Sequence, residues 1–230
     1  MPIKVLSAGA VKRGVSQIAQ QYETASGHAV SVEFDTAPIV RDRLRAGDDA
    51  HVVVLPPPML DELAREGRID NGHRGHIGRS RVGLFVKRDV ALPDISTVEA
   101  FADVLTRSDA VIYNTASSGL YIEQLLERLG LHEVLAARIE KVSSGAAVME
   151  KVAAHSGGAI GFGQLSEIRV QLDKGVAIAL VGPLPEEIQN STPYDAAVAS
   201  VATKVPGAAE LVAALTSSAA RAVFRATGID

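Results

Sequence analysis

The sequence predicts an α/β fold made of two lobes. Short apolar segments of strand length alternate with longer segments in which apolar residues recur at helical spacing. This alternation is typical of mainly parallel sheets that carry helices on both faces. A chain of 230 residues has room for two lobes of about 100 residues each. Connectors near residues 80 and 190 lead us to expect one lobe from residues 1–80 plus 191–230 and another from residues 81–190.

The first series predicts strands and helices in alternation. Strands are expected at residues 3–8, 29–34 and 51–55, which are short apolar or alternating runs. The helix after each strand ends at a glycine, as is common for helix C-termini: Gly27, Gly47 and Gly67. The polar, glycine-rich stretch at residues 70–79 is expected to be a connector to the second series.

The second series begins with an apolar strand at residues 82–87. Further strands are expected at residues 110–113, 159–162 and 176–181, and helices at residues 98–105, 119–129 and 145–154. A last strand at residues 196–201 and a C-terminal helical region are expected to return to the first lobe and complete it.

Composition excludes several classes of function. Aromatic residues make up only 4% of the chain, the net charge is −4 and no basic tract occurs, so nucleic-acid binding is not expected. The chain has no cysteine, which excludes disulfides, thiolate catalysis and cysteine-based zinc sites. No apolar run is long enough to cross a membrane, so membrane insertion is not expected. The start of the chain has no signal-peptide pattern, so we expect a periplasmic protein if a signal peptide was removed and a cytoplasmic one otherwise.

Two candidate binding turns follow the first two strands. Ligands of open α/β sheets bind beyond the carboxyl ends of strands, at helix N-termini. After the first strand, the small Ala10 lets a ligand approach the backbone, Val11 offers its amide, and Lys12 adds positive charge. A simple tight turn explains the same residues equally well. After the second strand, Thr36 and Ala37 open a helix, and the Thr36 hydroxyl is expected to cap it, with ligand contact as the alternative.

Two further turns lie in the second series. Residues Ser117, Ser118 and Gly119 come just before an amphipathic helix, where hydroxyls and backbone N–H groups converge at the positive helix end. We expect an anion to bind there, whereas a serine N-cap is the structural alternative. Gly145 enters another helix, and Gln164 follows a later strand and either donates to a ligand oxygen or is exposed.

Histidines give little support for a metal site or a cofactor. His73 and His76 lie three residues apart in a polar stretch, without a nearby pair of carboxylates, and are expected to be solvated. His51 stands at the head of an apolar strand, where it is either packed and hydrogen-bonded or serves as a base. No metal and no cofactor are expected.

The four turns resemble those of the molybdate-binding members of the type II periplasmic-binding-protein family, and the resemblance covers nearly the whole chain. It rests on the sequences VLSAGA at residues 5–10, RAG at 45–47, SGLY at 118–121 and IGF at 160–162. The resemblance implies the two-lobed Venus flytrap fold and a small oxyanion held in a cleft between the lobes. It also implies the function of a solute-binding protein with an ABC permease as its partner.

Three positions depart from the family pattern. Ala10 stands where the family has a serine, Gln164 where molybdate binders have a tyrosine, and His51 where an aspartate is usual. A buried oxyanion site rejects a ligand whose oxygens lose their donors. We therefore expect a di- or tricarboxylate as the ligand rather than molybdate.

Two other functions fit the same resemblance. One branch is similar to aconitate isomerase, and such an enzyme needs a base to move an allylic proton and donors to stabilise the resulting charge. His51 and Tyr121 are the candidates for catalysis in that case. The effector-sensing domain of a transcription regulator shares this fold, but no DNA-binding helices precede the first strand.

Overall fold

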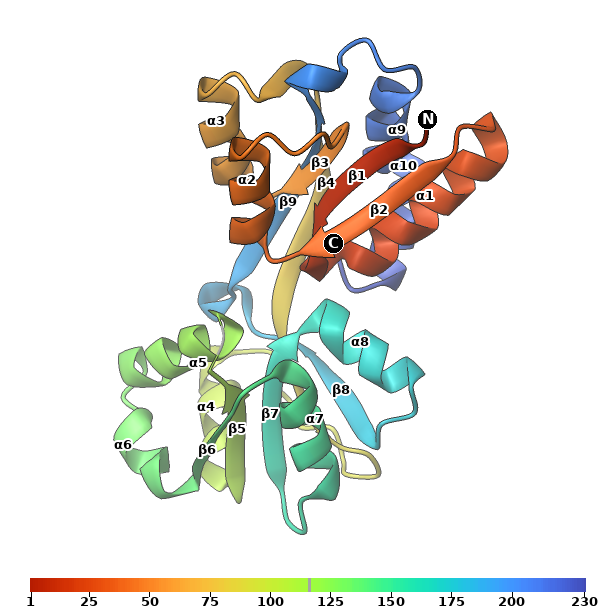
Figure 1. The fold of residues 1–230 in the computed structure, drawn as a ribbon. Coiled ribbons are helices and arrows are strands. Elements are labelled where there is room, and N and C mark those ends of the chain that lie inside the picture. Colours follow the sequence, from red (N-terminus) through yellow and green to blue (C-terminus); the bar gives the residue numbers. More distant parts are fainter. Residues whose placement is uncertain (116) are drawn as a thin grey trace. The chain divides into compact units, whose positions relative to one another are not determined.

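The computed structural model describes residues 1–115 and 117–230 (Figure 1). The chain forms two compact units. Unit 1 comprises Met1–Ser80 and Thr192–Asp230, and unit 2 comprises Arg81–Ser191. Both units have a sheet flanked by helices, as the α/β pattern predicts.

The sheet of unit 1 is parallel in its central part. It follows the order β2-β1-β3-β9, with β1 parallel to both β2 and β3, and β9 antiparallel to β3. The strands are β1 (Ile3–Ala8), β2 (Val30–Asp35), β3 (Val52–Leu55) and β9 (Ser191–Ala199). The long β4 (Ile69–Lys87) begins in unit 1 and ends in unit 2.

Helices of unit 1 follow its strands. They are α1 (Lys12–Ser26), α2 (Ala37–Arg45), α3 (Pro57–Arg65), α9 (Ala208–Leu215) and α10 (Ser218–Ala226), with short 3-10 turns at η1 (Gly9–Val11) and η4 (Ser200–Ala202). The helix α1 ends because Gly27 adopts a φ of 73°, and its amide donates to the Glu23 carbonyl. That left-handed conformation is one that glycine adopts at no steric cost, which is why the sequence signal is reliable here.

The sheet of unit 2 repeats the same design. Strand β5 pairs in parallel with both β6 and β7, and β4 pairs antiparallel with both β7 and β8. The remaining strands are β5 (Ala110–Asn114), β6 (Ile139–Val142), β7 (Ala159–Gln164) and β8 (Ile178–Pro183). The helices are α4 (Val98–Arg107), α5 (Ser117–Arg128), α6 (His132–Leu135), α7 (Gly145–Ala154) and α8 (Leu165–Asp173), with η2 (Ala136–Arg138) and η3 (Glu186–Ile188).

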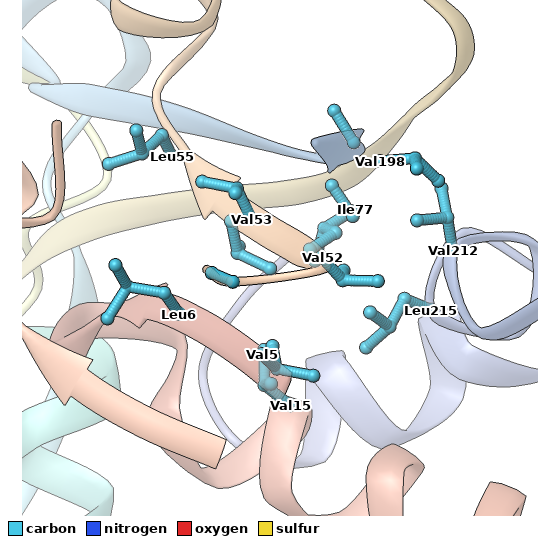
Figure 2. Close-up of a cluster of buried hydrophobic side chains, with 14 of the residues drawn as sticks. Val5, Leu6, Val15, Val52, Val53, Leu55, Ile77, Val198, Val212 and Leu215 are labelled. Carbon is cyan, nitrogen blue, oxygen red and sulfur yellow. The ribbon is translucent and has the colours of Figure 1, made fainter. Parts of the chain in front are cut away.

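The core of unit 1 lies around β1 and β3. All four residues of β3 are fully buried, because helices or other strands cover both faces of this strand. Figure 2 shows Val53 and Leu55 of β3 among side chains from β1, β4, β9, α1 and α9. Branched aliphatic side chains predominate, and their restricted rotamers suit a sheet that is buried on both faces.

The structure differs from the sequence prediction in several places, among them the last strand, which spans Ser191–Ala199 rather than residues 196–201. Residues 70–79 belong to β4 rather than to a connector, and the strand is hard to recognise there because most of its side chains are exposed. Three elements were also not predicted: β6, α6 and α8. Each is short or buries few residues, so its apolar periodicity is weak. No helix among the described residues is long and apolar enough to cross a membrane.

Replacing Leu55 by alanine tests the importance of the β3 core. Leu55 is fully buried, so Leu55→Ala is expected to lower the free energy of unfolding by about 3 kcal/mol through lost burial and a residual cavity. Chemical denaturation measures the loss. The same change at Leu92, which is 57% exposed, is the control and should cost less than about 0.5 kcal/mol. Equal losses at the two positions would contradict this description of the core.

Candidate functional site

Unit 1 presents two neighbouring turns at the carboxyl ends of β1 and β2. The parallel register places Ala8 beside Asp35 at the ends of these strands. The chain then enters η1 and α1 from β1, and α2 from β2. We call residues 9–12 and 35–37 the unit 1 turns. A methyl group at Gly9 would lie 3.6 Å from the Asp35 carbonyl, so the two turns are in close contact.

In the unit 1 turns, the first residues after β1 have apolar side chains, and the polar side chain of Lys12 follows them. Val11 is buried and Ala10 packs against the core, so these residues can offer a ligand mainly backbone groups. Lys12 is exposed at the first position of α1, and its Nζ lies 5.3 Å from the centre of the Phe34 ring. A cation at the positive end of a helix is unfavourable by itself and favours an anion nearby.

The prediction that the Thr36 hydroxyl caps α2 is wrong. Thr36 occupies the N-cap position, but its side chain makes no capping hydrogen bond, and its amide donates to Asp35 Oδ1 at 2.8 Å. The side chain is exposed, and Ala37 follows it as the first residue of the helix. The hydroxyl of Thr36 is therefore available to another partner.

His51 lies at the opposite end of the unit 1 sheet from these turns. Its Nδ1 accepts a hydrogen bond from the Lys4 amide at 3.1 Å, beside the start of β1. Desolvation lowers the pKa of His51, which favours the neutral form of the imidazole. These contacts are those of a packed structural histidine, and they give no support to the alternative in which His51 is a base.

Unit 2 presents three turns at one edge of its sheet. The parallel strands β6, β5 and β7 lie side by side, and each leads into a helix: β6 into α7, β5 into α5 and β7 into α8. We call residues 114–115, 117–119, 144–145 and 164–167 the unit 2 turns. Since the first N–H groups of each helix lack partners within the helix, three positive helix ends gather at this edge.

Asn114 holds the start of α5 in place. Its Nδ2 donates to Ser118 Oγ at 3.2 Å, and its Oδ1 accepts from the Gly119 amide at 3.2 Å. Both Asn114 and Ser118 are buried. Ser118 Oγ acts as an acceptor in this pair, which leaves its hydroxyl proton able to donate to a ligand. Ser117 is the first residue of α5, but its side chain is outside the described part of the chain.

The three turns meet at Gly145. A methyl group on this residue would lie 2.5 Å from Glu167 Oε2 and 3.9 Å from Asn114 Nδ2. The missing side chain of Gly145 thus makes room for the Glu167 carboxyl between α7 and α8. Ser144 caps α7 by accepting from the Ala147 amide at 3.2 Å.

Glu167 is exposed, yet enough protein surrounds its carboxyl for desolvation to raise its pKa. Perturbed carboxyl groups of this kind are concentrated at functional sites.

The other two predicted positions in unit 2 have defined places. Gln164 ends β7, is half-buried and precedes α8 at the N-cap position. Tyr121 lies one turn into α5, and its hydroxyl donates to the Ile188 carbonyl at 2.8 Å. That bond ties α5 to η3 and uses the donor that a catalytic tyrosine would need.

Sequence reasoning did not select Glu167, and it counted Asn114 only as one of four hydrogen-bonding side chains in the predicted binding loop at residues 114–121. Asn114 lies inside a predicted binding loop, but only the structure shows that its amide contacts Ser118 and Gly119. Glu167 is the third residue of α8, where an acid is common because it interacts favourably with the helix dipole. Nothing in the sequence around Glu167 therefore distinguishes it from an ordinary acidic residue in the first turn of a helix.

No group of three or more potential metal ligands occurs in the part of the chain that the structure describes. His73 and His76 are exposed, but each has a carboxylate partner that their sequence context does not reveal. His73 Nδ1 lies 2.7 Å from Asp70 Oδ2, and His76 Nδ1 lies 3.0 Å from Asp195 Oδ1.

The chain belongs to the bacterial extracellular solute-binding protein family, whose profile matches residues 3–230. Its fold is that of the type II periplasmic binding proteins. The substrate-binding domain of a putative molybdenum ABC transporter from Clostridium difficile is similar, with a TM-score of 0.81 and 16% identity over 99% of this chain and 97% of that chain. The periplasmic molybdate-binding protein of Azotobacter vinelandii has a TM-score of 0.70 and 20% identity over 99% and 98%. An aconitate isomerase from Pseudomonas sp. is 28% identical over 99% of this chain and 87% of its own length.

Replacing Gly119 by alanine tests the close approach of α5 to the end of β5. The new methyl group would lie 1.6 Å from the Asn114 carbonyl oxygen, which is a backbone atom and cannot move without displacing the strand. We expect Gly119→Ala to lower the free energy of unfolding by about 3 kcal/mol, the upper end of the usual range for overpacking. Thermal or chemical denaturation measures the change.

Gly145→Ala is the matched control. The one close contact of its methyl group would be with the end of the Glu167 side chain, which can rotate away, because Asn114 Nδ2 at 3.9 Å is at an ordinary van der Waals distance. The fold should therefore tolerate this change with a loss below about 1 kcal/mol, since alanine is also the better helix former. A Gly119→Ala protein as stable as the Gly145→Ala protein would contradict the described packing.

Proposed function

We propose that this chain is a solute-binding protein for a small anion, and that the anion is a di- or tricarboxylate. The observation that carries the proposal is the meeting of three helix N-termini at Gly145, next to the Asn114 amide and the Ser118 hydroxyl. Backbone N–H groups and hydroxyls at positive helix ends bind anions well without any metal ion. Unit 1, taken by itself, also has a cation and a hydroxyl at helix starts, Lys12 and Thr36.

The choice of a carboxylate over molybdate rests on the donors. Ala10 brings no hydroxyl, and Gln164 brings an amide where molybdate binders have a tyrosine. A tetrahedral oxyanion needs donors all around it, and each buried oxygen left without one costs about 1–3 kcal/mol. A planar carboxylate needs fewer donors in one place, which suits the amide and hydroxyl groups of the unit 2 turns.

The family description supports two further parts of the proposal. Members are described as extracellular solute-binding proteins, so we propose a periplasmic or other extracytoplasmic place of action. The similar Clostridium difficile protein is named as part of an ABC transporter, and we propose an ABC permease as the partner of this chain.

Isomerisation of a small carboxylic acid is the second candidate function. It is favoured by the similarity to the Pseudomonas aconitate isomerase, which extends over almost the whole chain. The same helix ends that bind a carboxylate would stabilise the charge that builds up when an allylic proton is removed.

A thermal-shift panel tests the choice of ligand. At a hundredfold excess over the Kd, a ligand stabilises the folded state by about 2.7 kcal/mol, which raises the Tm of a chain of this size by roughly 5 °C or more. We expect this shift with trans-aconitate or related di- and tricarboxylates. Strong stabilisation by molybdate, tungstate or sulfate, with none by carboxylates, would show that the ligand class is wrong.

Replacing Ser118 by alanine tests the place of binding. The change removes one hydroxyl donor at the start of α5, so affinity for the stabilising anion should fall about tenfold or more. Ser108→Ala is the matched control, because Ser108 is similarly buried but precedes β5, and its hydroxyl donates to the Leu105 carbonyl. Unchanged affinity in Ser118→Ala would remove Ser118 from the site.

Incubation with trans-aconitate separates catalysis from binding. Chromatography of the reaction mixture should show cis-aconitate accumulating if the chain is an isomerase of this kind. Binding of trans-aconitate without any conversion at high protein concentration would contradict the enzyme function and leave the binding function intact.

A further inference from the structure

Glu167 is a carboxyl at the point where the unit 2 turns meet, and anion binding alone gives it no role. Its Oε2 occupies the space that a side chain at position 145 would fill, with Asn114 Nδ2 close to the same point. Within the described residues, no hydrogen bond or ion pair engages the Glu167 carboxyl. The carboxyl is nevertheless held against the start of α7 by its own position in the first turn of α8.

Charged groups on the neighbouring elements do not neutralise Glu167. The helix α8 packs against α7, β7 and β8, and its Leu165 also lies beside Gly83 of β4. Strands β7 and β8 carry no charged residue. In unit 2, β4 carries Arg81, which forms an ion pair with Glu186, and Lys87, which donates to the His155 carbonyl. The helix α7 carries Glu150 and Lys151, and α8 itself carries Arg169 and Asp173. Lys151 forms an ion pair with a glutamate of β6. The pKa of Glu167 is raised by desolvation.

An ionised Glu167 would oppose the binding of an anion. Two negative groups in one partly desolvated place repel each other, whereas a protonated carboxyl donates a hydrogen bond to the anion. Two carboxyl groups can share one proton in this way, because their proton affinities are similar. A ligand carboxylate and Glu167 would form such a pair at Gly145.

We propose that Glu167 is the specificity-determining residue of the unit 2 turns, and that an anion binds there together with one proton held between Glu167 and the anion. The inference rests on the proposed anion-binding function and deepens it. A hydronium ion of the solvent supplies the proton: one of its O–H bonds breaks, water is released, and one O–H bond forms to a carboxyl oxygen, with no other covalent change. Binding of the anion is then linked to pH through a single residue.

Calorimetric titration at pH 6 to 8, in buffers of different ionisation enthalpy, counts the protons taken up. The probes are trans-aconitate and molybdate, and the proteins are the wild type, Glu167→Gln and Glu150→Gln. We expect the wild type to take up close to one proton per anion, with the Kd rising about tenfold per pH unit. Glu167→Gln should take up none and should bind at pH 8 about tenfold or more tightly than the wild type. Glu150→Gln removes an exposed carboxyl from α7 and should match the wild type.

The outcomes separate this inference from the proposed function. Binding of trans-aconitate without proton uptake, or with the same uptake in Glu167→Gln, would overturn the inference and leave the binding function intact. Molybdate binding with the expected uptake, in the absence of carboxylate binding, would overturn the ligand class and support the role of Glu167. If no anion binds to the wild type or to Glu167→Gln, both are wrong.

Thermal stability without ligand gives an independent readout. The pKa of Glu167 is raised in the folded state, so folding disfavours the ionised form of this carboxyl. The resulting loss of stability is fully present above the folded-state pKa. It disappears below the pKa that Glu167 has in the unfolded chain. Glu167→Gln should therefore melt above the wild type at pH 8, and the difference should vanish as the pH falls to about 4. A variant no more stable than the wild type at pH 8 would contradict the described environment.

Discussion

Parallel pairing of β5 with β6 and β7 is the constraint on which the candidate site depends. Strands that run in the same direction end at the same edge of the sheet, so the helices that follow them must start there. The amino ends of α5, α7 and α8 therefore lie at the same edge of the unit 2 sheet, and the pairing of the strands is enough to bring them there. Each helix end brings partial positive charge and free N–H groups, and on this basis we propose that an anion binds there.

Two glycines allow close contacts at these helix starts, because a side chain at either position would meet a neighbouring group. At position 119 the helix passes so near the Asn114 carbonyl that no other residue fits, which anchors α5 to the end of β5. At position 145 the space is filled by the Glu167 carboxyl rather than by backbone. The first glycine therefore serves packing, whereas the second leaves room for a chemical group. A raised carboxyl pKa at that point is a local cost to stability, which is common where function requires a strained or desolvated group.

Much of the fold could be predicted because it depends on local signals. Apolar runs mark the buried strands, and glycines such as Gly27 mark helix ends, since their conformation is accessible to few other residues. A very short element such as β6 was missed, because its four residues, most of them half-buried, leave no clear periodic pattern. Resemblance to the type II periplasmic binding proteins added the two-lobed organisation of the fold, which local patterns only suggested.

Prediction of the site was less complete, for a physical reason. The positions of the helix-start turns follow from the order of strands and helices, but the partners of their side chains depend on tertiary contacts. Thr36 has the ideal sequence position for a cap and yet does not cap. His51 follows a turn in sequence but lies beside Lys4 at the far end of the sheet. Glu167 can be recognised as a site residue only from the structure, in which its carboxyl fills the space left by the missing side chain of Gly145.

Amide chemical shifts recorded by NMR during titration with trans-aconitate would test the central claim most directly. If the unit 2 turns bind the anion, the amide signals of Gly119, Gly145 and Ala147 should shift together and saturate at one ligand per chain. The signals of residues at the opposite end of the same sheet, such as Asp109, should remain in place. Saturable shifts confined to another surface, with no change at Gly119 and Gly145, would contradict the proposed place of binding.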